Sequence, residues 1–503
     1  MISNYKFKIT NSKRSYKDGM ILISVIVFAA IAVTMTLGLV NWGASLLRSV
    51  QTVAQREQAL QIAEAGIDYY RWHLAHSPSD FYDGTNSTST SPYTHQYFDK
   101  DGDLLGTYAL TITPPAVGST IVGIISKGTL ASSTISRSIK VTMAIPSFAQ
   151  YAVVANDNMN FGAGTVTYGP IQSNKGIHFD GVAHGLVSSA LSTYTDPDTT
   201  SCTKANSWAV HTCVSGTGYP SGDPTSPSTL PTRSDVFTVG RQVSIPAVDF
   251  SSLTANLATL KSSAQSAGVY LTSSQYNGNA ALGYHIVLKT NNTFDLYVVT
   301  EVVPSPNNSC TSGGSSQTQW GLWTISTQQF IQTYTIPSNG IVFAEDNVWV
   351  DGTINHSRIS IVTAKLPDPG ASSEPSITVN SNLLYTNTDG TDVIGLISQG
   401  NINVGYGSSD VLTIDAALIS QNGRVGRYYY NSSCDGTYIR STLNLFGMIA
   451  TNLRYGFAYV DGQGNKTGYT NRNLTYDANL LYGPPPSFPL TSSYYTTLSW
   501  QEI

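Results

Sequence analysis

The chain has 503 residues, which is room for two or three domains with cores of their own. Charged residues make up 11% of the chain and hydrophobic residues 41%, so the composition excludes a disordered chain and suits a secreted β-protein rich in Gly, Ser, Thr, Asn and Tyr. The formal net charge of −5 gives no sign of a nucleic-acid partner, which would need clustered basic residues on the domain that binds it.

The N-terminus combines a basic leader with a long apolar run. Five basic residues precede the run: Lys6, Lys8, Lys13, Arg14 and Lys17. Residues 20–40 carry no charge, and as a helix they would cross the roughly 30 Å core of a bilayer. The run exceeds the roughly 7–15 apolar residues of a cleaved secretory signal. The basic leader predicts a cytoplasmic N-terminus, with everything after Val40 outside.

Helical periodicity continues beyond the apolar run. Apolar residues recur every three or four positions and form a stripe: Trp42, Leu46, Val50, Val53, Leu60, Ala63, Ile67, Tyr70 and Leu74. We therefore expect one helix over residues 20–75, about 84 Å long by helix rise. Its first half is apolar all round, and its second half is amphipathic.

The leader ending in Gly19, the apolar half-helix from Met20 and the sequence Ala63-Glu64-Ala65-Gly66 resemble type IV pilins, most closely the PilX-type minor pilins. The resemblance covers roughly residues 1–75. It implies that a prepilin peptidase removes residues 1–19 and methylates Met20, and that the subunit lies in the inner membrane before assembly. It also implies that other pilins are its partners, because a helix apolar on every face must be buried in lipid or among similar helices.

One position departs from the family pattern. Most pilins have a glutamate at the fifth residue after the cut, where it offsets the N-terminal charge of the neighbouring subunit, and here this residue is Ser24. Without the carboxylate, packing below an existing subunit loses a charge pair, whereas a subunit that begins a filament has no neighbour above it. Ser24 therefore points to the filament tip. The alternative is a single-pass membrane protein whose N-terminus is never cut.

Residues 76–147 are expected to form a small antiparallel β headgroup that covers the amphipathic half of the helix. Three runs alternate in the manner of strands, at residues 104–114, 120–130 and 134–146. The acidic sequence from Asp99 to Asp103 could suggest a calcium loop, but the further oxygen ligands and the glutamate of such a loop are not at the required spacing. We expect a hairpin turn there.

A quasi-repeat begins after Pro146, in which a polar turn precedes two apolar residues and a glycine. Its copies lie at residues 155–162, 173–181, 344–352 and 399–405, with short strand-like runs between them. This pattern predicts a parallel β-solenoid over residues 148–503, with Asn and Ser side chains stacking between coils. A β-sandwich is the alternative. The fold class is thus α+β and mostly β.

The repeat is interrupted at about residues 193–339, which we expect to be an α+β insertion. Within it, residues 249–268 predict a helix that ends at Gly268, and residues 283–302 predict a hairpin turning at Asn291-Asn292. The proline-rich segment at about 480–503 is expected to cap the solenoid without forming a regular element.

The chain has four cysteines, all beyond the membrane segment: Cys202, Cys213, Cys310 and Cys434. Their even number in an oxidising compartment predicts disulfides, and four cysteines allow three connectivities. We expect Cys202–Cys213 as a clamp within the insertion and Cys310–Cys434 as a link back to the scaffold. No Cys-x-x-Cys or histidine pairing indicates zinc, and we expect no metal and no cofactor.

Many parallel β-helices cleave polysaccharides, so a membrane-anchored carbohydrate-active enzyme (a lyase or hydrolase) is the competing functional class. The candidate residues are Asp346, Asp351, His356, Arg358 and Lys365. Turn and surface roles explain them at least as well, so we expect no enzyme. A charged cluster on one solenoid face would favour the enzyme, and a polar uncharged face would favour a structural protein. His178 and His184 flank a turn and are expected to be solvated.

These observations predict a minor pilin or pseudopilin that primes or caps a type IV pilus-like filament and carries a large extracellular head. A head of residues 148–503 could hardly be repeated along a tightly packed shaft. Its Tyr, Thr, Ser and Asn content suits contact with a surface carbohydrate or protein ligand, and hence adhesion. The protein would first be a single-pass membrane protein and then lie on a filament or the cell surface.

Overall fold

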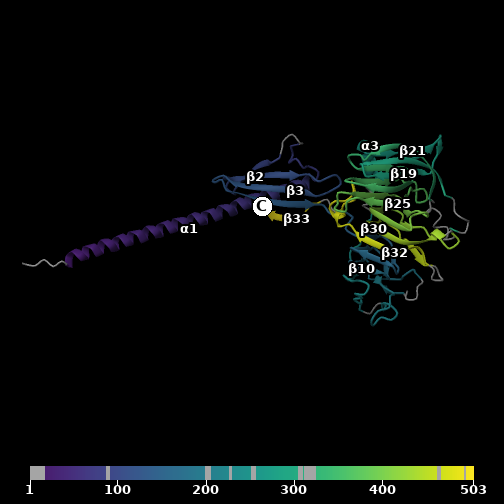
Figure 1. Cartoon of the computed structure of the whole chain (residues 1–503), viewed down its shortest axis with the longest axis horizontal. Coiled ribbons are helices and arrows are strands. Elements are labelled where there is room, and N and C mark those ends of the chain that lie inside the picture. The colour runs from purple at the N-terminus through teal and green to yellow at the C-terminus, as the bar shows by residue number, and fades with distance from the viewer. Residues whose placement is uncertain are drawn as a thin grey trace, which may run out of the picture.

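The computed structural model describes residues 17–85, 91–198, 205–225, 229–250, 257–303, 310, 324–434, 436–460, 466–491 and 494–503. A long helix is followed by a small antiparallel sheet and a parallel β-solenoid (Figure 1). The expected fold class is therefore confirmed, and the parallel pairing of successive coils rules out the β-sandwich. Most of the expected leader lies outside the described residues, so its removal stays a prediction.

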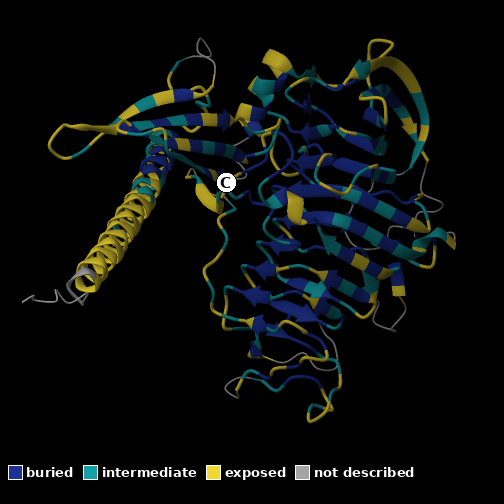
Figure 2. Cartoon of the chain, turned by 60° about the vertical axis from the view of Figure 1, so that its left-hand side comes forward, coloured by how far each residue is buried: buried dark blue, intermediate teal, exposed yellow. Residues whose placement is uncertain are grey.

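Helix α1 (Lys17–His76) is continuous, as its periodicity predicts. Only its last five or so turns pack against the sheet, through a buried stripe: Ala59, Ile62, Ala63, Ile67, Tyr70 and Leu74. The earlier part of the predicted stripe, from Trp42 to Val53, is exposed, because the sheet does not extend that far along the helix (Figure 2). Gly128 lies where any side chain would overlap the helix backbone at Ala59 and Ala63, so helix and sheet are in close contact.

The sheet has the order β1-β2-β3-β4-β33 and is antiparallel throughout. Its strands are β1 (Tyr93–Phe98), β2 (Leu104–Thr113), β3 (Val122–Leu130), β4 (Ser136–Ala144) and β33 (Thr496–Glu502). Strands β2 to β4 match the three predicted runs, and β1 was not predicted. The expected turn at residues 99–103 is also confirmed, because the Asp99 carboxylate accepts hydrogen bonds from the backbone N–H groups of Asp101 and Asp103.

The C-terminal segment departs from its prediction. We expected residues 480–503 to cap the solenoid without regular structure, and only their first part lies on it. The side chains of Leu480 and Phe488 are buried against the coils. The chain then returns to the headgroup, where β33 pairs with β4 and Glu502 forms an ion pair with Arg137. The prolines end at residue 489, so nothing prevents a strand after them.

The solenoid is built from three parallel ladders. The first contains β16 (Val269–Leu271), β22 (Ile341–Ala344), β24 (Arg358–Thr363), β26 (Val393–Ser398), the second halves of β28 (Val411–Ser420) and β30 (Ile439–Thr451), β5 (Val153–Ala155), β8 (Ile171–Ser173), β11 (Val187–Ser189) and β15 (Arg241–Gln242). The second contains β19 (Gly283–Lys289), the first halves of β23 (Val348–Ile354) and β25 (Ile377–Tyr385), β27 (Ile402–Val404) and β29 (Val425–Arg427), and further along the stack β6 (Met159–Phe161), β9 (Ile177–Phe179) and β14 (Val210–His211). The third contains the remaining halves of β23, β25, β28 and β30, then β32 (Lys466–Tyr476), β7 (Thr165–Tyr168) and β10 (Val182–His184).

The coils do not follow one another in sequence order. The chain leaves the headgroup, enters the stack at β5 and winds outward to β15. It resumes at the opposite end with β16 and winds back to β30 and β32, which pair with β5 and β7. The solenoid is therefore circularly permuted, and the chain enters and leaves it at neighbouring coils in the middle of the stack (Figure 1).

This order corrects the expected insertion at residues 193–339, because that range supplies coils at both ends of the stack. At one end, β14 and β15 continue the ladders. At the other end, β16 and β19 continue the ladders, and the helix α3 (Leu257–Ala267) precedes β16. The predicted hairpin is confirmed as β19 and β20 (Thr293–Val302), and β21 (Ile325–Thr335) extends it. The predicted helix is confirmed to its C-terminal end, and residues 251–256 before it lie outside the described part.

The remaining elements of the described residues are short. They are β12 (Thr193–Tyr194) with β13 (Ser207–Trp208), β17 (Gln275–Tyr276) with β18 (Asn279–Ala280), β31 (Ala458–Val460), and the 3-10 helices η2 (Gly436–Tyr438) and η3 (Ala478–Leu481).

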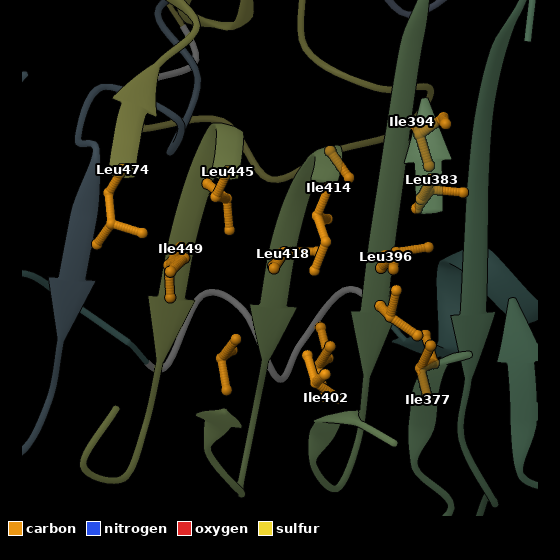
Figure 3. Packing of buried hydrophobic residues seen from close by; sticks show 14 of the residues in the cluster. Ile377, Leu383, Ile394, Leu396, Ile402, Ile414, Leu418, Leu445, Ile449 and Leu474 are labelled. Carbon is orange, nitrogen blue, oxygen red and sulfur yellow. The ribbon is translucent and has the colours of Figure 1, made fainter. Parts of the chain in front are cut away.

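Aliphatic side chains fill the solenoid, and asparagines connect its corners. Ile and Leu residues of successive coils stack in the interior, as Figure 3 shows. At one corner, the amide of Asn174 donates to Asn156 over 2.8 Å, and that of Asn156 donates to Asn452 over 2.9 Å. The expected stacking of Asn between coils is therefore confirmed, and it crosses the point where the sequence order breaks.

The head also contains the predicted disulfide between Cys310 and Cys434. It lies in a small cluster with the buried rings of Tyr406, Tyr428 and Tyr430. The other predicted bond, Cys202–Cys213, involves Cys202, which lies outside the described residues. Cys213 itself is disulfide-bonded.

Candidate functional site

The outer part of α1 is apolar on all sides and contacts no other part of the described chain. The helix is long and apolar enough to cross a membrane, and the most apolar stretch of it is not buried at all. Met20 is 73% exposed, Phe28 is 72% exposed and Trp42 is 67% exposed. At about 25 cal/mol per Å² of apolar surface, leaving so many large side chains in water would cost on the order of tens of kcal/mol. This surface must therefore be covered by lipid or by other helices.

The hydroxyl groups of residues 20–40 need no partner from outside the helix. The hydroxyl of Ser24 donates to the carbonyl of Met20 over 2.8 Å, and the hydroxyls of Thr34 and Thr36 donate to carbonyls one turn earlier. Since these side chains satisfy themselves within the helix, the segment can enter an apolar environment without losing hydrogen bonds. Ser24 offers no carboxylate to a neighbouring N-terminus. Gly19 lies inside the first turns of α1, and whether the chain is cut there stays a prediction.

The headgroup is joined to the solenoid by two adjacent segments, one entering and one leaving. Ser147 donates through its hydroxyl to the carbonyl of Leu480 over 2.7 Å, and the N–H of Thr491 donates to Pro146 over 3.0 Å. The N–H of Thr120, on the headgroup side, donates to Tyr482 over 2.9 Å. These hydrogen bonds hold the solenoid to the headgroup, and the headgroup packs on the end of α1.

The five catalytic candidates do not form one cluster. Asp346 is buried at the corner between β22 and β23, where its carboxylate accepts two hydrogen bonds from Ser274. Asp351 contacts His285 of β19 over 3.2 Å, and this pair could not be predicted because 66 residues separate its members.

Of the other three candidates, His356 and Arg358 line one hollow and Lys365 lines another. Arg358 donates to the backbone carbonyls of Gly390, Gly483 and Pro484, and burial lowers its pKa. His356 lies in the turn after β23 with a φ of +48°, and Lys365 lines a groove. Asp346 and Arg358 therefore have structural partners, and these contacts give the enzyme alternative no particular support.

The groove beside Lys365 is an open polar hollow of about 380 Å³ on the solenoid. Its polar lining includes Asn347, Glu374, Ser376, Asn401, Asn403 and Asn422. Asn403 is only 3% exposed, yet among the residues that the structure describes neither atom of its side-chain amide has a hydrogen-bond partner. Glu374 accepts from Asn422 over 2.7 Å, and burial raises the pKa of this carboxyl. The surface is thus mostly amide and hydroxyl, with one charge of each sign.

The two histidines expected to be solvated behave differently. His184 is exposed, as expected. His178 is only 2% exposed, which corrects the prediction, because a loop that carries Asp196 covers the outer face of β9. Burial lowers the pKa of His178, but the nearby carboxylates of Asp180 and Asp196 outweigh it and raise the pKa to about 9. The spacing His178-x-Asp180 is a local signal that these two side chains lie close together. Nothing in the sequence indicates that the loop with Asp196 covers His178.

No protein-family model and no curated protein matches the chain. Among solved structures, the crystal structure of the competence-associated pilin ComZ from Thermus thermophilus is similar at 15% identity and a TM-score of 0.29. The match covers 89% of this chain and 97% of that chain. At this TM-score, the likeness does not bear on the fold or function of this chain, which have to be inferred from its own residues.

Proposed function

We propose that this chain is a minor pilin or pseudopilin that primes or caps a type IV pilus-like filament. The observation that carries the proposal is the division of α1: its inner turns pack on the headgroup sheet of the same chain, and its outer turns are apolar all round and uncovered. A membrane can cover the outer turns before assembly, with the N-terminus cytoplasmic and the head outside. Equivalent helices of other pilins cover them afterwards.

The size of the head supports a place at the tip. Ten strands stack along the first ladder, and at about 4.8 Å between neighbouring strands the stack is about 45 Å long. Packed helices lie only about 8–10 Å apart. A stack of this length, lying across the direction of α1 in Figure 1, is hard to repeat on every subunit of a shaft. Ser24 adds to this support, because a first subunit needs no carboxylate for a neighbour above it.

Localising the head on sheared filaments tests the tip position. Antibody against the solenoid should label filament ends in electron micrographs, with at most one label per filament. The variant Phe28→Asp, which places a charge on the uncovered apolar surface, should remove the label from the filament fraction. Thr52→Asp, on the polar part of the same helix, should leave the label in place. Labels spaced along the shaft would contradict the proposed position.

We further propose that the groove beside Asn403 gives the head an adhesive function. A buried amide with no partner for its oxygen or its nitrogen is costly to maintain, and a hydroxyl-rich ligand such as a glycan could satisfy both atoms. Full-length protein in detergent should bind at least one glycan on an array, and Asn403→Ala should weaken binding at least tenfold, or about 1.4 kcal/mol. The exposed Asn473→Ala should bind as the wild type does, and equal binding by both variants would remove this role from the groove.

The competing class is a membrane-anchored carbohydrate-active enzyme. The present contacts of Asp346, Asp351 and Arg358 give it no particular support. A glycan that is bound by the wild type and also shortened by it would favour the enzyme, and intact glycan after long incubation would favour the structural and adhesive protein.

A further inference from the structure

A buried cluster of two histidines and an aspartate lies near one end of the solenoid. His211 of β14 stacks in register on His178 of β9, with ring centroids 4.8 Å apart. Asp196, from the loop after β12, covers the two rings. The side chains of the three residues are only 2–3% exposed. Two coils and a loop thus bring three metal-ligating side chains together out of contact with solvent.

One nitrogen of each histidine lies close to the same oxygen of Asp196. Nδ1 of His178 lies 2.9 Å from Oδ2 of Asp196, and Nε2 of His211 lies 3.3 Å from the same oxygen. These are ion-pair distances, but within the described residues none of the three atoms forms a well-aligned hydrogen bond. The angles at the ring nitrogens are therefore unsuitable for a hydrogen bond to that oxygen. Three buried polar atoms held together without a well-aligned hydrogen bond are uncommon in a folded protein, and a further group that replaces the proton of His178 would satisfy all three.

The other polar atom of each side chain is held by the protein. Nε2 of His178 contacts the Asp180 carboxylate over 3.0 Å, and Nδ1 of His211 lies 3.4 Å from the Tyr194 hydroxyl. The second oxygen of Asp196 accepts from a backbone N–H over 3.0 Å. Metal ligands in proteins show this arrangement, in which one atom faces the metal and the other is fixed by an outer partner.

We propose that Nδ1 of His178, Nε2 of His211 and Oδ2 of Asp196 bind a divalent transition-metal ion, with Zn²⁺ as the best match. Two imidazoles and a carboxylate suit zinc, and a water molecule would complete a tetrahedral site. Cys213 lies near this cluster, but it is disulfide-bonded and has no thiolate to offer. Asp198 is also near, but both its oxygens are engaged by Arg454, over 2.8 and 2.6 Å.

The metal would have a structural role. His178 and His211 belong to successive coils, and Asp196 belongs to the loop that covers them, so one ion would fasten the three segments together. The end coils of a solenoid lack a neighbour on one side and need such stabilisation. The proposal adds a binding site to the head and does not depend on whether the head lies at a filament tip.

The test uses untagged full-length protein in detergent, stripped with a chelator, incubated with Zn²⁺ and desalted. Elemental analysis should find about one zinc per chain, and the melting temperature should rise on zinc addition. His211→Gln and Asp196→Asn should each lose the bound zinc and the rise in melting temperature. Asp180→Asn, which removes an outer partner, should weaken binding by roughly 10–100-fold. The exposed His184→Gln is the matched control and should keep one zinc.

A second measurement uses the wild-type protein alone and so does not depend on the folding of any variant. Co²⁺ added to the stripped wild-type protein should produce the intense visible absorption of a tetrahedral site, and Zn²⁺ should abolish it. Wild-type protein that retains no zinc and gives no such absorption would overturn the proposal. Zinc retained equally by the wild type and by folded His211→Gln would also overturn it, because the ion would then be bound elsewhere.

Discussion

Asp415 is a single residue whose ionisation should make the stability of the head depend on pH. Its carboxylate lies on β28 and accepts a hydrogen bond from the N–H of Tyr385 over 3.0 Å. Burial raises the pKa of Asp415 to about 6, because it outweighs the lowering by the Tyr385 hydrogen bond, and the nearby Asp477 raises the pKa slightly more. The folded protein therefore keeps a proton that the unfolded chain, with its ordinary pKa of 3.8, has already lost.

The sign of the effect follows from this difference. The contribution of Asp415 to stability is fully present below about pH 4 and is lost as the pH rises through about 6. Asp415→Asn cannot ionise, so the variant should lose less stability than the wild type between pH 4 and 7, by on the order of 1–3 kcal/mol. Denaturant unfolding of full-length protein in detergent, repeated across this pH range, measures this difference in the free energy of unfolding. The exposed Asp101→Asn should follow the wild type, and parallel pH curves for the wild type and Asp415→Asn would contradict the assignment.

Asn156 connects coils that are far apart in sequence, so its removal should be costly. It donates to Asn452 and accepts from Asn174. Asn156→Ala leaves both partners unsatisfied in a half-buried corner and should lower the free energy of unfolding by about 1–3 kcal/mol. Asn473→Ala breaks a similar 2.8 Å bond in an exposed place and should cost less than about 0.5 kcal/mol. Equal losses in the two variants, measured by denaturant unfolding, would mean that the corner bonds do not hold the coils together.

At the scale of elements, the contact between α1 and the headgroup sheet depends on a glycine. A side chain at Gly128 of β3 would overlap the backbone of Ala59 and Ala63, so Gly128→Ala must push the helix from the sheet. We expect a loss of about 1–3 kcal/mol, the usual cost of overpacking a core. Gly123→Ala on the same strand is the control, because its new methyl group would meet nothing nearer than Thr113 at 3.4 Å. If the two variants melt at the same temperature, the helix does not pack on β3 as described.

Local patterns predicted the elements well, and the pairing between distant elements could not be predicted. Alternation identified β2 to β4, and two asparagines identified the hairpin of β19 and β20. The repeats correctly indicated coils, because each copy is a corner between two ladders. The order of the coils in the stack depends on which coils pair with one another, and nothing in the repeated sequences indicates that β30 pairs with β5. The covering of His178 by Asp196 was missed for the same reason.

At the scale of the whole molecule, the permuted solenoid explains how a large head can be joined firmly to a slender helix. The chain enters and leaves the solenoid at neighbouring coils, and β33 returns to complete the headgroup sheet beside β4 (Figure 1). Two segments of the chain rather than one therefore connect the head to the headgroup. Force applied to the head would be shared between them and would reach the sheet that holds α1.

The central claim is that the uncovered apolar half of α1 is released from its leader and buried among other helices in a filament. The most direct test is the mass of the N-terminal peptide of this chain, taken from sheared surface filaments of cells with and without prepilin peptidase. With the peptidase, we expect a chain in the filament fraction that begins at N-methylated Met20. Without the peptidase, we expect an intact residue 1, found in the membrane only. An intact residue 1 in both kinds of cell, with the protein confined to the membrane, would contradict the account.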